Sequence, residues 1–159
     1  MTGIDEYRFR SVLSRFASGV TVVTARGGDG VDHGITVSAF CSLSLDPPLV
    51  LVCIDHAAVM HGILDSAAAF TVNVLAADQE DLARRFSDPD DDRFEGTSYT
   101  RGANGLALLT GAAARLECAL THRFEGGDHT IFVGRVEAAD ASDAQPLLYY
   151  RGGYASFGA

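Results

Sequence analysis

The sequence predicts a mainly β protein with a largely antiparallel sheet, closed or nearly closed into a barrel, and a few short α-helices. Three observations support this fold class. Several short stretches are rich in β-branched residues, which favour strands. Glycine-rich turns separate many of these stretches, and such turns join antiparallel strands. The regular alternation of strands and helices that marks a doubly wound parallel sheet is missing, and closing an antiparallel sheet removes its exposed edges.

The N-terminal part of the chain predicts one helix and one hairpin. Apolar side chains recur at helical spacing over Ile4–Ser18, which predicts an amphipathic helix that Gly19 ends. Val20–Thr24 are all β-branched and predict a strand. Residues 27–30 are glycines and an aspartate, which are typical of a hairpin turn, so we expect Ile35–Phe40 to form the returning strand.

The middle of the chain predicts two strands, two helices and one long loop. Leu49–Ile54 is apolar almost throughout, which predicts a strand buried on both faces. A short helix fits Ala57–Asp65, and Phe70–Leu75 predicts another strand. Asp78 is a suitable cap for a following helix. The polar stretch Ser87–Gly105 is expected to be irregular, and long loops of this kind often bind ligands.

The C-terminal part predicts strands alone. They cover Ala113–Phe124, Thr130–Ala139 and Leu148–Phe157, and the pair Gly126-Gly127 makes the turn between the first two. The chain contains no internal repeat and no linker. Its 159 residues match the common size of one domain, so we expect a single domain over residues 1–159.

Charge and composition argue against two classes of partner. The formal net charge is −9, and no basic stripe exists to neutralise nucleic-acid phosphates or to dock on anionic membranes. No apolar run reaches the roughly 20 residues of a membrane-spanning helix, and the first residues lack the pattern of a signal peptide. The three cysteines are odd in number and widely spaced, which is typical of reduced thiols in a cytoplasmic protein.

Common nucleotide-binding and metal-binding motifs are absent from the sequence. It contains neither the glycine-rich Rossmann fingerprint nor a P-loop, and no serine-nucleophile or zinc-protease motif. His56 and His61 are five residues apart, which is the wrong spacing for one face of a helix. The aspartates within 88–92 lack the spaced ligands and the glycine of a calcium loop. We therefore predict no metal site.

Hydroxyl side chains recur in the segment that starts with the second predicted strand. Thr36, Ser38, Ser42 and Ser44 occupy alternate positions over stretches of this segment. Small hydroxyl groups and neighbouring backbone N–H groups can bind a phosphate, or the edge of a flavin ring, without blocking its approach. The alternative is a polar strand face that points to solvent.

Two later segments carry residues suited to ring binding. His129 follows a glycine–aspartate turn and opens a strand, where its near-neutral pKa would let it orient a nicotinamide or help move a proton. The alternative is a turn histidine with no role. Tyr149 and Tyr150 lie beside Arg151 and could line a ring-binding cleft, or they could be aromatic residues of an edge strand.

Taken together and in order, these segments resemble the flavin reductase family whose members serve two-component monooxygenases. The resemblance rests on FRSVLSRFASGVTVVTA, HGITVSAFCSLSLDPPLVLVCID, FTVNVL, LARRF, GDHTIFVGRV and PLLYYRGGY. It implies a Greek-key split β-barrel of the FMN-binding type that forms a homodimer. It also implies reduction of FMN or FAD by NADH or NADPH, with the reduced flavin passed to a partner monooxygenase.

The resemblance also implies site residues. His129 would lie beside the nicotinamide as the catalytic residue. The implied flavin-binding residues form three stretches. The first, Thr36, Val37 and Ser38, would lie against the ring or ribityl chain, and the second, Ser42, Leu43 and Ser44, would contact the flavin through backbone and hydroxyl groups. The third, Cys53, Ile54, Asp55 and His56, would lead to the ribityl phosphate. Relatives often carry a basic or hydroxyl residue just after the third predicted strand, Leu49–Ile54, where this chain reads His56-Ala57-Ala58-Val59-Met60. Phosphate binding could instead use the N–H groups at the start of the next helix, with His56 assisting.

Two other functions fit the same barrel. A non-enzymatic flavin carrier or electron-transfer protein would bind FMN tightly and show little turnover with NADH. An oxidase similar to pyridoxamine-phosphate oxidase would need basic residues in a phosphate pocket, and this chain has few. Turnover of added flavin by NADH or NADPH distinguishes the reductase from both.

Overall fold

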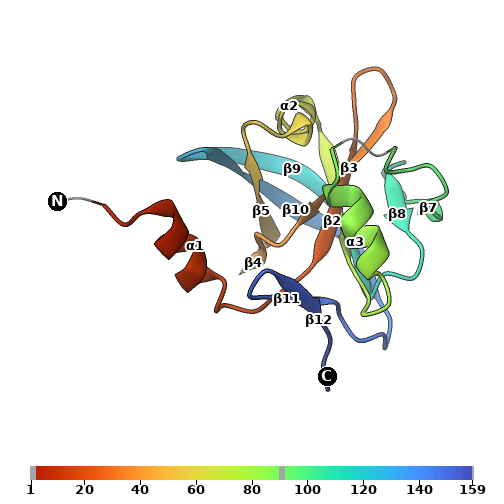
Figure 1. Cartoon of the computed structure of the whole chain (residues 1–159). Helices are drawn as coiled ribbons and strands as arrows, with labels where there is room; N and C mark the ends of the chain where they lie inside the picture. Colours follow the sequence, from red (N-terminus) through yellow and green to blue (C-terminus); the bar gives the residue numbers. More distant parts are fainter. Residues whose placement is uncertain (1–2, 90–91, 159) are drawn as a thin grey trace.

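The computed structural model describes residues 3–89 and 92–158, which form a mainly β fold of antiparallel sheets with short helices around them (Figure 1). The N-terminal elements are α1 (Glu6–Leu13), β1 (Ser18–Gly19), β2 (Thr21–Arg26), β3 (Asp32–Val37), β4 (Phe40–Leu45), β5 (Pro48–Asp55), α2 (Val59–Ser66) and β6 (Ala69–Val74). The remaining elements are α3 (Glu80–Ser87), β7 (Tyr99–Arg101), β8 (Ala107–Leu109), β9 (Ala114–Gly126), β10 (His129–Ala141), β11 (Leu148–Tyr150) and β12 (Gly153–Ala155).

The main sheet has seven strands in the order β3-β2-β6-β9-β10-β5-β4, and every pair in it is antiparallel. Its two edge strands, β3 and β4, are consecutive in the chain and are separated by Ser38 and Ala39 alone. The sheet must therefore curve until its edges approach each other. No hydrogen-bonded ladder joins β3 to β4 within the described residues, so the sheet is not closed. The predicted mainly β, antiparallel class is confirmed.

The concave side of the sheet holds the main core. Phe70 of β6 and Phe132 of β10 are fully buried there, together with Leu64 of α2. On β5, alternate side chains such as Val52 and Ile54 face this core, as strand geometry requires. The other face of β5 is half-buried or exposed, so the predicted burial on both faces is wrong. A strand of a single curved antiparallel sheet has one core face, whereas a strand between helical layers has two.

The helix α3 packs on the outside of β2 and β3 (Figure 1). Its buried Phe86 joins Val22 of β2 in a second, smaller apolar cluster. The prediction that Asp78 caps this helix is wrong, because the N-cap residue is Gln79. The Gln79 side chain accepts a hydrogen bond from the Ala76 N–H and donates one to the Thr110 carbonyl, so it anchors the turn instead.

The helix α1 is shorter than predicted and packs poorly on its own chain. Asp5 caps it by accepting a bond from the Arg8 N–H, and the helix ends at Leu13 instead of Ser18. Residues 18–19 form β1, which pairs with β11, so Gly19 is a strand residue and not the helix stop. None of the α1 residues is buried. Figure 1 shows α1 projecting to one side of the sheet.

Three further boundaries differ from the sequence expectations. The predicted strand Ile35–Phe40 is interrupted after Val37, because the chain turns there from one sheet edge to the other. The segment Ser87–Gly105 contains the short strand β7 within its described residues. The predicted strand Leu148–Phe157 is a small hairpin of β11 and β12. No helix in 3–89 and 92–158 has the length and apolar character needed to cross a membrane.

Gly134 of β10 packs directly against the ring of Phe70. A Cβ at this position would lie 2.5 Å from the Phe70 ring and 2.8 Å from the Cβ of Cys118. We expect Gly134→Ala to lower the free energy of unfolding by about 1–3 kcal/mol, because overpacking a dense core displaces its neighbours. Gly62→Ala is the matched control, since nothing lies within 4 Å of the added Cβ. Equal denaturation midpoints for the two variants would contradict this prediction.

Candidate functional site

The hydroxyl residues at the β3–β4 crossing do not form one surface. The Thr36 hydroxyl donates to the Ala83 carbonyl of α3 at 2.7 Å. Val37 is buried in the core, and its carbonyl accepts a bond from the Thr21 hydroxyl. Ser38 is exposed at the crossing itself. Thr36 and Val37 can therefore offer a ligand little beyond their backbone, whereas Ser38 can offer its hydroxyl.

The second predicted stretch lies on the edge strand β4. Ser42 and Leu43 are exposed, and Ser44 is half-buried. The pairing with β5 shifts between Ser42 and Ser44, which is a β-bulge and changes the alternation of their side chains. None of the three lines either of the two larger cavities described below.

A cavity of about 750 Å³ lies between α1 and the outer face of β4 and β5. Of the predicted flavin-binding residues, Ser38 and Cys53 line it, and so does Tyr149, which the sequence offers as a residue of a ring-binding cleft. Burial raises the pKa of the Cys53 thiol, which keeps it protonated. Most of the wall is apolar or aromatic, with side chains from four parts of the chain: Phe9, Leu13, Phe16, Phe40, Leu51 and Tyr149.

A second cavity, of about 520 Å³, opens at the start of α2. Its walls are residues 31–35, residues 57–60 and part of the segment that follows α3. Arg93 ties this last wall to β3 by donating to the Gly34 carbonyl at 2.6 Å. The N-cap residue of α2, Ala58, provides no side-chain hydrogen bond. The first N–H groups of α2 therefore have no side-chain cap and lie beside a cavity, an arrangement that suits an anion.

His129 opens β10 directly after the β9–β10 turn. The turn residue Gly127 has a φ of 76°, a backbone conformation that glycine adopts without strain. The Asp128 carboxylate lies 2.7 Å from His129 Nδ1. That hydrogen bond, with the charge of His129 and of nearby His56, lowers the pKa of Asp128. Because a carboxylate only accepts, His129 carries a proton on Nδ1, and Nε2 is the nitrogen that can meet a ligand.

The end of β5 brings three predicted residues together. Asp55 is the cross-strand partner of His129, and the His56 N–H donates to the Asp128 carbonyl. The Asp55 carboxylate accepts a bond from the Ala57 N–H and so shapes the turn into α2. Ile54, by contrast, is buried in the core and cannot touch a ligand with its side chain. Asp55, His56 and His129 therefore form one group, and Ser38 and Cys53 form another.

Sequence spacing missed a contact between two histidines. His56 precedes α2 and His61 lies within it, so the helical-spacing argument does not apply to them. Their rings are 4.9 Å apart, and both Nε2 atoms approach the hydroxyl of Thr130. No group of three or more histidines, cysteines or acidic residues within the described part of the chain could hold a metal ion. Residues 90–91 of the acidic stretch lie outside the described residues.

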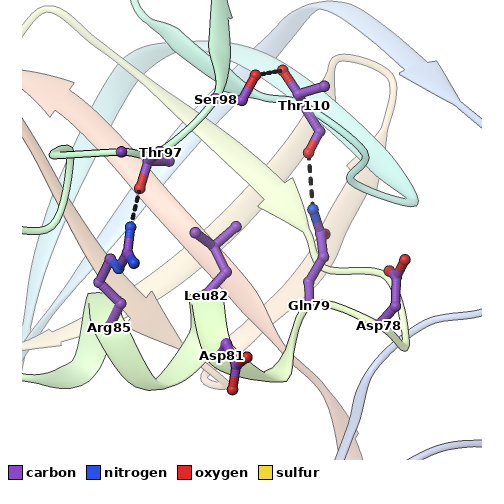
Figure 2. Close-up of a pocket in the computed structure, with 9 residues that line it drawn as sticks. Asp78, Gln79, Asp81, Leu82, Arg85, Thr97, Ser98 and Thr110 are labelled. Atoms are coloured by element: carbon purple, nitrogen blue, oxygen red, sulfur yellow. Dashed lines mark hydrogen bonds between the residues drawn. The ribbon is translucent and has the colours of Figure 1, made fainter.

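A third, smaller pocket of about 260 Å³ lies between α3 and residues 96–98 (Figure 2). In Figure 2 the pair Arg85 and Thr97 lies on one side of Leu82 and the pair Gln79 and Thr110 on the other. Arg85 bonds the Thr97 hydroxyl, and Gln79 bonds the Thr110 carbonyl. These two hydrogen bonds attach α3 to the segments on either side of the β7–β8 hairpin.

The protein thus has a mainly β fold of antiparallel strands with two large cavities beside its main sheet. The chain belongs to the flavin reductase-like domain family, whose sequence profile matches residues 13–158. It is 40% identical to the reductase subunit of a flavin-dependent monooxygenase from Rhodococcus jostii, covering 95% of this chain and 77% of that protein. It is 43% identical to an NADH-dependent FAD reductase from Streptomyces globisporus, covering 94% of this chain and 84% of that protein.

Solved structures agree with this assignment. The chain matches the NADH:FAD oxidoreductase of Streptomyces globisporus, solved in complex with NAD and FAD fragments, with a TM-score of 0.92 and 40% identity. That match covers 99% of this chain and 97% of the other. The chain spans about half, 53%, of a longer Sinorhizobium meliloti protein, with a TM-score of 0.93 and 39% identity.

Proposed function

We propose that this chain is a flavin reductase, a single domain over residues 1–159 that uses NADH or NADPH to reduce FMN or FAD for a partner flavin-dependent monooxygenase. The observation that carries the proposal is the group at the β9–β10 turn, where Asp128 orients His129 beside Asp55 and His56. This group lies in a chain that is similar over nearly its whole length to an NADH:FAD oxidoreductase. Its geometry leaves one imidazole nitrogen of His129 available to a ligand.

The residues around the 520 Å³ cavity fit a flavin phosphate. The N–H groups that open α2 would hold it, because a helix start without a side-chain cap attracts an anion. His56 lies in the turn that leads into this helix and would stand beside that phosphate. The remaining predicted contacts would come from the backbone of Thr36 and Val37, the hydroxyls of Ser38, Ser42 and Ser44, Leu43 of the edge strand β4, and Cys53 of its neighbour β5.

The protein's part in the reaction is to position the flavin and the nicotinamide and to exclude water from them. A bound flavin supplies the hydride acceptor itself. His129 would orient the nicotinamide through Nε2 and hold or move a proton there, since Asp128 fixes the Nδ1 side. Holding two reactants in contact geometry contributes up to about 7–11 kcal/mol to such reactions. No side chain needs to act as a nucleophile.

We also propose that the active form is a homodimer with a split barrel in each subunit. The two sheet edges are joined by the short crossing at Ser38 and Ala39, which supports the split barrel. The apolar residues Phe9, Leu13 and Phe16 are half or more exposed beside the 750 Å³ cavity, and a second copy would cover them. The three free cysteines support a cytoplasmic location.

Anaerobic stopped-flow absorbance tests the proposed function. The purified protein is mixed with an excess of FMN or FAD and then with NADH or NADPH, and bleaching of the flavin band is followed. We expect rapid bleaching with many turnovers, and the fastest pair identifies both cofactors. Bound flavin that neither nucleotide bleaches would overturn the proposal in favour of a carrier or an oxidase.

A further inference from the structure

Thr130 is the second residue of β10 and is buried, with 2% of its surface exposed. Its hydroxyl has three polar neighbours from three other places in the fold. His61 Nε2 of α2 lies at 2.8 Å, and His56 Nε2 of the β5–α2 turn lies at 3.2 Å. The third neighbour is Glu125 Oε1 of β9, at 3.3 Å. The pairing of β10 with its neighbouring strands uses backbone groups, so these three contacts of the Thr130 hydroxyl are additional to those that hold the sheet together.

Counting protons assigns the direction of each bond. A hydroxyl donates one hydrogen bond and accepts two, and a carboxylate only accepts. All three contacts are satisfied at once when Thr130 donates to Glu125 and both imidazoles donate from Nε2. The second oxygen of Glu125 lies 3.2 Å from His56 Nε2, which supports the same direction. His61 is held further by the edge-on contact of its ring with Phe132.

This network is attached to the turn that carries His129. Thr130 adjoins His129 in the chain, and the two side chains lie on opposite faces of β10. The His56 main-chain N–H donates to the Asp128 carbonyl at 3.0 Å, and the Asp128 side chain orients His129. The other end of the network is His61, on the helix whose start borders the 520 Å³ cavity. One hydroxyl thus ties the turn of His129 to α2.

We propose that Thr130 is a positioning residue: its hydroxyl, with His56, His61 and Glu125, fixes the β9–β10 turn relative to α2 and so holds His129 with Nδ1 toward Asp128. The effect of Thr130 on the rate of flavin reduction rests on the proposed function, whereas its effect on the orientation of His129 does not. His129 itself touches the substrate in that function, and the network acts through it.

Thr130→Val removes the hydroxyl and keeps the side-chain volume, and Thr130→Ser restores the hydroxyl. The matched control is Thr121→Val on β9, whose hydroxyl bonds the Val133 carbonyl and takes no part in the network. We expect Thr130→Val to slow single-turnover flavin reduction at saturating NADH roughly three- to tenfold, the loss expected for one hydrogen bond. Thr130→Ser and Thr121→Val should stay near the wild-type rate.

Nitrogen-15 spectra of the imidazoles provide a second readout that needs neither flavin nor NADH. At mildly alkaline pH we expect wild-type His129 to carry its proton on Nδ1 and Thr130→Val to lose this fixed tautomer. An unchanged His129 tautomer in Thr130→Val would overturn the inference, even where the rate falls. If Thr130→Val does not fold, His61→Leu against His61→Gln replaces it, because glutamine can still donate to Thr130. Absence of flavin reduction by the wild type would overturn the proposed function and leave the tautomer test intact.

Discussion

Replacing His129 by alanine is expected to slow hydride transfer from NADH to flavin about 100-fold, the low end of the effect of a positioned acid or base. The flavin dissociation constant should stay nearly unchanged, because the phosphate contacts proposed at the start of α2 do not involve this side chain. His129 is 40% exposed in its side chain and has its Nδ1 engaged by Asp128. The imidazole is therefore oriented but still accessible, as a group that meets a diffusing nucleotide must be.

The measurement is single-turnover stopped flow at saturating NADH, with flavin affinity measured separately by fluorescence. The control is His122→Ala on the same hairpin, since His122 is exposed and stacks on Phe124 away from the turn. His122→Ala should match the wild type in both quantities. A wild-type rate in His129→Ala, or a loss confined to flavin affinity, would remove His129 from the mechanism.

The parts of the fold that the sequence predicts well are those set by local physics. The β2–β3 hairpin follows from β-branched strands around a glycine-rich turn, and Gly27 does close this turn through backbone bonds with Gly30 and Val31. The long β9–β10 hairpin follows in the same way from its own glycine turn. Strand type and hairpin pairing are local properties, so a single sequence is enough to predict them.

The site was less predictable because it depends on distant contacts. Thr36 and Ser38 occupy alternate positions in the sequence, yet the strand ends at Val37 and the Thr36 hydroxyl bonds to α3, a helix far along the chain. His56 and His61 looked unsuited to a shared site, and Thr130 of β10 brings them together. Thr130 carried no sequence signal of its own beyond its position after His129. Sheet order, which places β10 beside β5, brings Thr130 to His56 and cannot be derived from residue patterns alone.

The second large effect is expected from a substitution in α1, and it concerns the stability of the proposed dimer. An isolated helix of eight residues is shorter than the roughly 12–15 that are marginal in water, and α1 buries none of its residues against its own chain. Its stability must therefore come from contact with another surface. The apolar residues Phe9 and Leu13 face the 750 Å³ cavity, whose opposite wall is the half-buried outer face of β5. A second copy of the chain, related by a twofold axis, would bury both surfaces at once.

Leu13→Asp is accordingly expected to weaken the proposed dimer by at least roughly 100-fold, because each interface would then bury an unpaired carboxylate. Ser11→Asp is the control, since Ser11 lies on the opposite side of the same helix and does not line the cavity. Sedimentation equilibrium should give a dimer for the wild type and Ser11→Asp, and a monomer for Leu13→Asp at the same concentration. A monomeric wild type, or an unaffected Leu13→Asp, would show that α1 is covered by something other than a second copy. Secondary structure measured by circular dichroism should change little, because the seven-stranded sheet and its core do not include α1.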